Sequence, residues 1–498
     1  MLAVTVTNAA TAEPADTTPP AFESCSIGDG RARVIAECAT LAVPLDHDAP
    51  DGATIDLAIA RVPARRGGSD GTAFTLLAGG PGQSAIDSYA ALAFAFRHVG
   101  RDRDIVLVDQ RGTGASHPLD CPDAGAVATG EDDATLDTSS AEAARAAAAC
   151  RASLDVDPRF FTTSVAVRDL DRVRARLGLR AWHLYGISYG TRVAQHYTRR
   201  HPDRVATMIL DAVVPPDVPL GPDVAPFADR ALALVFARCT ADPDCAIRFP
   251  DIERRTRAWL DELDAAPLDV DHEDLVSGGT RRSRFGSREL AAVLRLMSYN
   301  AQTAALLPSM LGAAIDDGHL VPLVRQVALQ GGSLGESLAS GMHHAIVCTE
   351  DAPRIPDGAA AASRDTILGT ALLEALVASC RDWPPGALDP DFHEPLDVAV
   401  PTLILSGEAD PITPPAYGER VAATLPRARH IVLPDQGHMQ APLGCMPSIL
   451  ARFVASVPTG DGERADHDGG GEAIALDTDC LDRLVPPPFF VDPNGPMP

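Results

Sequence analysis

One serine lies in a sequence pattern that can make it a nucleophile. Ser188 stands between Gly186 and Gly190 in the stretch Gly-Ile-Ser-Tyr-Gly, directly after a short apolar run. Where such a stretch joins a strand to a helix, the tight turn lifts the serine hydroxyl above the sheet, and the glycines avoid side-chain clashes. Residues 183–185 are typical of a buried strand, and residues 189–200 of a helix. This setting favours a nucleophile over an ordinary glycine-rich turn.

A candidate base and a candidate orienting acid follow much later in the chain. A serine hydroxyl is a poor nucleophile unless a histidine accepts its proton and an acid orients that histidine. Asp410 follows the strand-like residues 402–406, and His438 follows the strand-like residues 430–433. Taken singly, the histidine could be a surface loop residue and the aspartate a turn former. Together, their order after Ser188 is that of an α/β-hydrolase triad, so we expect Ser188, Asp410 and His438 to act as one unit.

A glycine-rich loop is a candidate for stabilising the negative charge that develops on the attacked oxygen. The stretch Gly-Gly-Pro-Gly at residues 79–82 follows the apolar run 73–77. Backbone amides aimed at the developing oxyanion are the usual donors in such enzymes. We expect the amides of Gly80 and Tyr189 to form the oxyanion hole, although Gly-Gly-Pro-Gly could be only a tight turn.

Composition excludes several classes of function. The 498 residues include 46% apolar residues, enough for a sizeable core, and carry a formal net charge of -26. This charge argues against nucleic-acid binding. All 42 residues counted as lysine or arginine are arginines, which excludes Schiff-base, serine-lysine and P-loop lysine chemistry. No apolar run approaches the ~18 residues of a membrane helix, so we expect no membrane span.

The ten cysteines indicate an oxidising compartment. They are dispersed, without a C-x-x-C pair or zinc-like spacing, so we expect neither a metal nor another cofactor. Buried free thiols are the alternative, but an even number suits disulfides. We expect neighbours to pair: 25 with 38, 121 with 150, 239 with 245, 348 with 380 and 445 with 480. Residues 1–15 are interpreted as the trimmed end of a signal peptide, which predicts a secreted or periplasmic protein.

The order of the expected elements predicts an α/β fold with a mostly parallel sheet and helices on both faces. Strand-like runs at 54–62, 73–77 and 104–108 precede an amphipathic helix at 164–177, and a further strand follows at 205–214. Mostly helical patterns then replace the alternation. We therefore divide the chain into a leader and linker (1–22), a core (23–216 and 397–498, the latter with the C-terminal tail) and an inserted helical cap (217–396).

Several of these segments together resemble the proline iminopeptidase and tripeptidyl aminopeptidase group of α/β hydrolases. They are the loop 79–82, the stretch Asp-Gln-Arg-Gly-Thr-Gly at 109–114, the serine turn, the Asp410 and His438 segments and the tail around Cys445 and Cys480. One departure is Ala78, where the iminopeptidases usually carry histidine. The resemblance implies a serine exopeptidase that acts on peptides with free N-termini through an acyl-enzyme.

The same resemblance implies an acid that holds the substrate's ammonium group. The segment 348–353 is similar to the cap segment that supplies this acid, with Glu350 the first choice and Asp351 the second. Among 68 acidic residues, either could instead be an ordinary solvated side chain. Two other functions compete with the peptidase. A carboxylesterase would use the same triad, and a binding module on this fold would be expected to lose one of its members.

Overall fold

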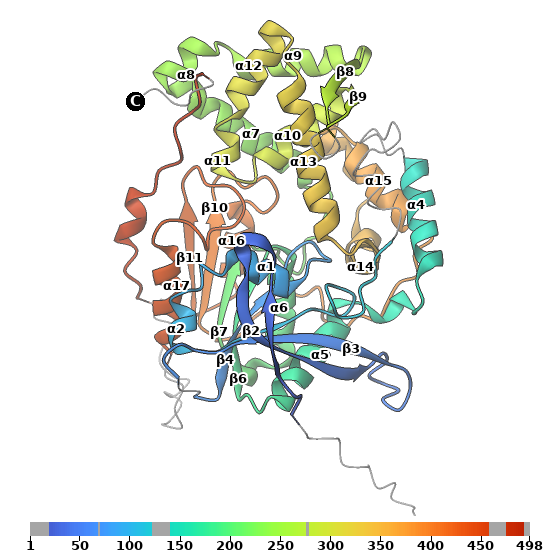
Figure 1. Cartoon of the computed structure of the whole chain (residues 1–498), viewed down its shortest axis with the longest axis vertical. Helices are drawn as coiled ribbons and strands as arrows, with labels where there is room; N and C mark the ends of the chain where they lie inside the picture. Colours follow the sequence, from blue (N-terminus) through green and yellow to red (C-terminus); the bar gives the residue numbers. More distant parts are fainter. Residues whose placement is uncertain (1–18, 68–69, 122–139, 275–277, 458–474, 493–498) are drawn as a thin grey trace, which may run out of the picture.

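The computed structural model describes residues 19–67, 70–121, 140–274, 278–457 and 475–492. The segment interpreted as a signal remnant, residues 1–15, lies outside the described residues. Figure 1 shows the chain with a group of helices above a twisted sheet.

The described strands form one nine-stranded sheet and one small hairpin. The sheet order is β1-β2-β3-β5-β4-β6-β7-β10-β11, with antiparallel pairs as far as β5 and parallel pairs beyond it. The mostly parallel sheet predicted from the sequence is therefore confirmed. The strands are β1 (Glu23–Ile27), β2 (Val34–Pro44), β3 (Thr54–Val62), β4 (Thr72–Leu77), β5 (Ile105–Val108), β6 (Ala181–Ile187), β7 (Val205–Asp211), β10 (Thr402–Gly407) and β11 (Ala428–Leu433).

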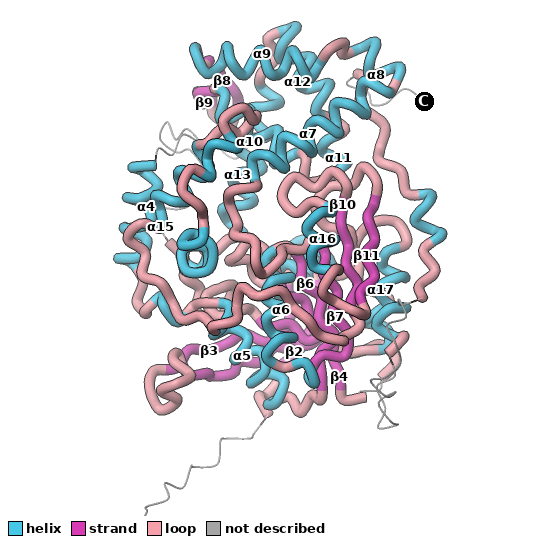
Figure 2. Tube along the Cα trace, turned by 180° about the vertical axis from the view of Figure 1, so that it is seen from behind, coloured by secondary structure: helices cyan, strands magenta, loops and turns pink. Residues whose placement is uncertain are grey.

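Helices cover both faces of this sheet, as expected. In β5, Ile105 and Leu107 belong to one apolar cluster, whereas Val106 and Val108 belong to another, because successive strand residues point to opposite faces. The first cluster packs under α1 (Ala85–Leu92) and α17 (Met446–Ala455), and the second under α5 (Thr163–Arg176), α6 (Tyr189–Arg200) and α16 (Pro415–Ala422). Figure 2 shows the strands as one layer with helices around it.

A helical insertion, here the elements α7 to α15, comes between β7 and β10. It has its own apolar cluster, which includes Phe236, Trp259 and Leu311. Its elements are α7 (Val224–Ala241), α8 (Pro243–Arg248), α9 (Ile252–Ala265), β8 (Leu268–Glu273), β9 (Thr280–Phe285), α10 (Ser287–Met297), α11 (Ala301–Ala304), α12 (Leu307–Asp317), α13 (Val321–Ser337), α14 (Ser340–Ile346) and α15 (Ala371–Cys380). The β8–β9 hairpin is the part that helical patterns did not predict.

Two features tie the insertion to the rest of the chain. The C-terminal tail places Leu481 in the cluster under α17 and Phe489 in the cluster of the insertion, where the Arg238 guanidinium lies 4.4 Å from the ring centroid of Phe489. The helix α4 (Ser140–Ser153) packs against α15 (Figure 1). The remaining short elements are α2 (Val99–Asp102) and the single turns Gly30–Ala32, Pro158–Phe160, Pro202–Arg204, Ala352–Arg354, Ala359–Ser363 and Asp479–Arg483.

All ten cysteines form disulfides, in the neighbour order that the sequence analysis expected. The pairs are Cys25–Cys38, Cys121–Cys150, Cys239–Cys245, Cys348–Cys380 and Cys445–Cys480. In the described part of the chain, every helix is too short or too polar to cross a membrane.

Candidate active site

Ser188 occupies a strained turn between β6 and α6. Its φ of 54° and ψ of -125° lie outside the common regions for a residue with a side chain. A Cβ on Gly190 would lie 2.1 Å from the Leu77 carbonyl oxygen, and one on Gly186 would lie 2.5 Å from the Gly190 carbonyl oxygen. The turn therefore requires both glycines, because the backbones of β4, β6 and α6 approach too closely for a side chain.

The strand register brings the candidate residues to one edge of the sheet. Leu77 at the end of β4 pairs with Gly186, and Ile187 at the end of β6 pairs with Asp211. Asp211 in turn pairs with Leu405 of β10. The parallel strands therefore end together, and the loops that carry Ser188, Asp410 and His438 leave from the same edge.

Asp410 and His438 are in direct contact. The Asp410 Oδ2 atom lies 2.8 Å from Nδ1 of His438, and the carboxyl group is fully buried. The Thr413 hydroxyl donates to Oδ2 of Asp410 at 2.8 Å, while the amides of Ile412 and Thr413 donate to Oδ1 at 2.8 and 2.9 Å. These donors fix the carboxylate, which in turn orients the imidazole so that Nε2 is left to act as a base.

The environment of His438 favours its protonated form. Burial lowers the pKa of the imidazole, but the charge and hydrogen bond of Asp410 outweigh it, so that the pKa is raised above its usual value. The charge of Asp211 acts in the same direction, and that of Arg295 opposes it. The amide of His438 donates to the Tyr299 carbonyl at 2.7 Å, so a residue of the insertion holds the histidine loop.

Asp211 is a buried acid at this site that the sequence analysis did not identify. Its backbone carbonyl accepts a 3.0 Å hydrogen bond from the Ser188 amide. Its carboxylate accepts hydrogen bonds of 2.8 Å from the Tyr185 hydroxyl and from the amides of Gln440 and Ala441. Burial raises the pKa of the carboxyl group to about 6. One signal was present in the sequence, because the apolar run of β7 ends on a charged residue.

The loop at residues 79–82 lies beside the serine, as expected. A Cβ on Gly79 would lie 3.1 Å from Cβ of Ser188, and Gly80 has a φ of 106° that disfavours a residue with a side chain. Among the residues that the structure describes, the amides of Gly80 and Tyr189 have no acceptor. Two unused donors beside a serine are what an oxyanion hole needs.

The stretch Asp-Gln-Arg at 109–111 makes hydrogen bonds to residues that follow the loop at 79–82 and to the residue after Ser188. The Asp109 carboxylate accepts hydrogen bonds of 2.8 Å from the Ser84 hydroxyl, 3.0 Å from the Ile86 amide and 3.0 Å from the Ala115 amide. The Gln110 amide nitrogen donates to the Tyr189 hydroxyl at 3.1 Å. The stretch thus fixes the residues on both sides of the candidate oxyanion hole.

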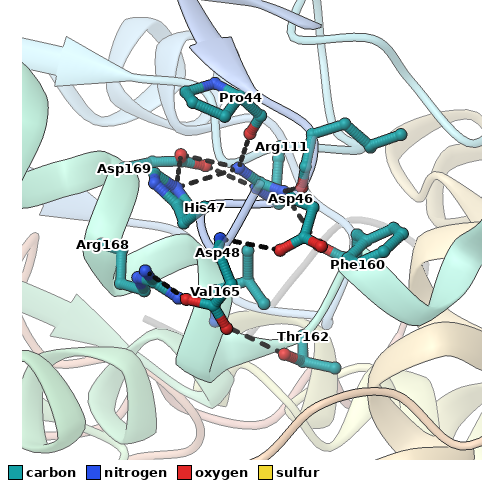
Figure 3. A network of polar contacts seen from close by, with 11 residues as sticks. Pro44, Asp46, His47, Asp48, Arg111, Phe160, Thr162, Val165, Arg168 and Asp169 are labelled. Carbon is teal, nitrogen blue, oxygen red and sulfur yellow. Dashed lines mark hydrogen bonds and ion pairs between the residues drawn. The ribbon is translucent and has the colours of Figure 1, made fainter. Parts of the chain in front are cut away.

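Arg111, the last residue of this stretch, lies at the centre of a buried polar network (Figure 3). Its guanidinium, fully buried, donates to both carboxylate oxygens of Asp169 at 2.6 and 2.7 Å. It also donates to the backbone carbonyls of Pro44 and Phe160 at 3.1 and 3.0 Å. His47 contacts the same aspartate at 2.7 Å. Because a bidentate pair has fixed geometry, the network sets the position of the middle of α5, where Asp169 lies.

The two acids suggested by the resemblance lie in a π-helical turn, Val347–Asp351, after α14, and both are fully buried. Glu350 accepts hydrogen bonds of 2.8 Å from the Thr163 amide and 3.0 Å from its hydroxyl. The Thr163 hydroxyl lies 2.6 Å from the hydroxyl of Tyr189, the residue after the serine. The acids are therefore linked to the serine turn by a short chain of hydrogen bonds.

Asp351 has an oxygen atom without a partner. Its Oδ1 accepts hydrogen bonds of 2.9 Å from Arg192 and 2.8 Å from the Leu220 amide. Its Oδ2 is buried and has no hydrogen-bond partner among the described residues. An unsatisfied buried acceptor costs about 1–3 kcal/mol, so this oxygen could accept a hydrogen bond from a bound donor.

Arg192, on α6, is a further residue that the sequence analysis missed. Its Nη1 atom lies 2.9 Å from Oδ1 of Asp351 and 3.8 Å from Oε2 of Glu350, so one guanidinium faces two carboxyl groups. Burial raises the pKa of Glu350 to about 8, Arg192 opposes this shift, and Asp351 adds to it. If both acids ionise, the cluster carries one negative charge in excess, which matches one ammonium group.

Within the described ranges, no group of three or more His, Cys, Asp or Glu side chains is placed to hold a metal ion.

Two family models match the sequence. Residues 72–240 match a model described as the alpha/beta hydrolase fold, and residues 365–464 match one described as TAP-like protein. The first match includes Ser188 and the loop at 79–82, and the second includes Asp410 and His438.

Three relatives show how the chain compares with named proteins. The chain is 26% identical over 433 residues to the serine protease Hip1 of Mycobacterium tuberculosis, covering 78% of this chain and 79% of that protein. It is 32% identical over 199 residues to the tripeptidyl aminopeptidase of Streptomyces lividans, 36% of each chain. It is also 30% identical over 248 residues to carboxylesterase B of Mycobacterium tuberculosis, 47% of each chain.

Proposed function

We propose that this chain, which belongs to the α/β hydrolases, is a serine aminopeptidase that hydrolyses peptide bonds near free N-termini. The triad of Ser188, His438 and Asp410 supplies the chemistry. Two relatives of the chain are named as a serine protease and a tripeptidyl aminopeptidase, which supports a peptidase over other hydrolases.

We propose the following reaction, which the contact between Asp410 and His438 supports. His438 removes the proton of the Ser188 hydroxyl as Oγ attacks the scissile carbonyl carbon, and Asp410 stabilises the resulting imidazolium. The amides of Gly80 and Tyr189 donate to the oxyanion. The imidazolium then protonates the leaving amine, the C–N bond breaks, and an acyl-enzyme remains. Water activated by His438 attacks this ester and releases the N-terminal fragment.

The observation that carries the aminopeptidase proposal is the buried acid pair. The unpartnered Oδ2 of Asp351, together with the excess negative charge that the pair carries beside Arg192 when Glu350 is ionised as well, suits a single ammonium group. Binding the ammonium there sets how far the scissile bond lies from the N-terminus. The helical insertion, which we propose spans residues 217–396, thereby acts as a cap that supplies specificity to a core formed by residues 23–216 and 397–498.

A carboxylesterase is the second candidate, because one relative bears that name and the triad serves esters and amides alike. The two functions are separated by assaying anilides with a free or an acetylated N-terminus beside simple esters. The aminopeptidase proposal expects the free-amine anilide to be cleaved well and the acetylated one poorly. An enzyme that cleaves esters and ignores both anilides would be a carboxylesterase.

We further propose that the protein works outside the cytoplasm, secreted or periplasmic, because five disulfides persist only under oxidising conditions. Peptide mapping of the unreduced protein from its native host tests this. Five linked peptide pairs are expected, and ten alkylatable thiols would refute it.

A further inference from the structure

A groove of about 1410 Å³ lies next to the candidate active site. Four of its lining residues are neighbours of the site in the sequence: Ile187 precedes the serine, Met439 follows the histidine, Gly82 ends the oxyanion loop, and Gln83 follows it. From there the groove runs between α1 and the N-terminal strands, which lie side by side in Figure 1. The groove therefore adjoins the residues next to Ser188 and His438.

The groove and the acid pair are next to different residues of the serine turn. Ile187, before the serine, lines the groove, whereas the Tyr189 hydroxyl, after it, contacts Thr163, which donates to Glu350. A peptide whose ammonium is held by Asp351 crosses Ser188 with its acyl part on the acid side. The part of the peptide beyond the scissile bond then continues on the other side, into the groove.

The charge of the groove indicates which peptides it suits. Among its lining residues are Glu23, Asp87, Asp109 and Asp120, and no arginine, lysine or histidine belongs to the described lining. Glu23, Asp87 and Asp120 are exposed, so their charges act on whatever enters, whereas Asp109 is buried and already bonded to Ser84 and Ile86. Glu23 lies on β1 and Asp87 on α1, the two elements between which the groove runs.

On the basis of the proposed aminopeptidase function, we propose that this groove binds the leaving part of the substrate and selects peptides with basic residues directly after the scissile bond. Arginine or lysine side chains there pair with the exposed carboxylates of Glu23 and Asp87. Each such surface pair is expected to raise kcat/KM by about twofold to fivefold through KM, and added salt weakens the effect.

The test uses the full-length protein and peptides that share a fixed N-terminal part with a free amine. The residues after the bond that is cut are arginine, glutamine or glutamate, and the cut position is read by mass spectrometry. The proposal expects kcat/KM to fall in the order arginine, glutamine, glutamate. In the double variant Glu23→Gln, Asp87→Asn the ratio of the arginine to the glutamate peptide is expected to approach one.

A matched control removes the same kind of charge elsewhere. Glu262 is exposed on α9 in the helical insertion, so Glu262→Gln is expected to keep the wild-type ratio. Equal rates for the three peptides, or a ratio unchanged in the double variant, would overturn the proposal. A free-amine anilide, which has no residue beyond the bond, separates the two claims: if the wild type fails to cleave it, the aminopeptidase function itself is wrong.

Discussion

The backbone carbonyl of Asp211 accepts a hydrogen bond of 3.0 Å from the amide of Ser188, while the carboxylate of the same residue holds the loop after His438. One residue at the end of β7 thus fixes both the nucleophile and the base. Because its carboxylate is fully buried, these bonds are shielded from water and hold the two loops at a constant separation.

Replacing Asp211 by asparagine is expected to lower kcat/KM about tenfold to a hundredfold, because one charge-assisted acceptor is lost. The pH profile should also change. The charge of Asp211 helps to raise the pKa of His438, which faces Asp410, Arg295 and Tyr299 as well. Without this charge the imidazolium of His438 is less stable, so its pKa falls. In Asp211→Asn the decrease of kcat/KM on the acidic side of the pH profile should therefore occur at lower pH.

Tyr185→Phe is the matched control for this shift. It removes the hydroxyl that donates to the Asp211 carboxylate but keeps the carboxyl group near His438. Because this hydrogen bond lowers the pKa of Asp211, its loss weakens the negative charge at acidic pH, so the acidic limb of kcat/KM is expected to lie between those of the wild type and Asp211→Asn. A profile for Asp211→Asn that coincides with the wild type would show that the residue only supports the fold.

Removing the nucleophile is expected to abolish turnover without unfolding the protein. Ser188→Ala should lower kcat by about 10⁴-fold or more, because the triad acts as a unit and alanine fits the same turn. Asp410→Asn should be similarly severe, since an amide favours the wrong tautomer of His438. Turnover rates and circular dichroism measured together check both statements, and near-wild-type turnover in either variant would refute the assigned roles.

Asp351→Asn is expected to lower kcat/KM for a free-amine anilide by about a hundredfold, the cost of losing one charge-assisted contact to the ammonium. A simple acetyl ester has no ammonium, so its hydrolysis should fall far less. The exposed Asp357, six residues further along, offers the matched control Asp357→Asn. Equal losses on anilide and ester would indicate damage to the fold instead of a lost contact.

The effect of Glu350→Gln is expected to depend on pH. Burial raises the pKa of Glu350 to about 8, so at lower pH the wild-type side chain is mostly neutral and resembles glutamine. The ratio of wild-type to variant kcat/KM on a free-amine anilide should therefore increase with pH and level off above about pH 8. The substrate amine also changes its protonation state with pH, but it does so equally for both enzymes and therefore does not change this ratio. A ratio that stays constant from pH 6 to 9 would show that Glu350 does not contact the amine.

Local pattern was enough to predict the serine turn. The helix expected at 189–200 is α6 (Tyr189–Arg200), and the strand expected at 54–62 is β3 (Thr54–Val62). Both elements have strong periodicity, and the serine turn between β6 and α6 has strict steric requirements. The neighbour pairing of the cysteines was also predicted, and the structure confirms it.

Features that depend on distant partners could not be predicted in this way. Nothing near Arg192 in the sequence shows that it becomes buried against two carboxyl groups, and the apolar run before Asp211 does not show which amides its carboxylate binds. The β8–β9 hairpin was missed for another reason. Its two strands bury only Val270 and Phe285, so the alternation that identifies a strand is nearly absent.

Labelling by a fluorophosphonate, which reacts when an activated serine displaces its fluoride, tests most directly whether Ser188 is the nucleophile of an aminopeptidase. Labelling should be followed with and without a short peptide that carries a free or an acetylated N-terminus. One adduct is expected, on Ser188. Labelling should be slower with the free-amine peptide than with its acetylated counterpart at equal concentration. An adduct on another residue, no adduct, or equal protection by both peptides would contradict this proposal.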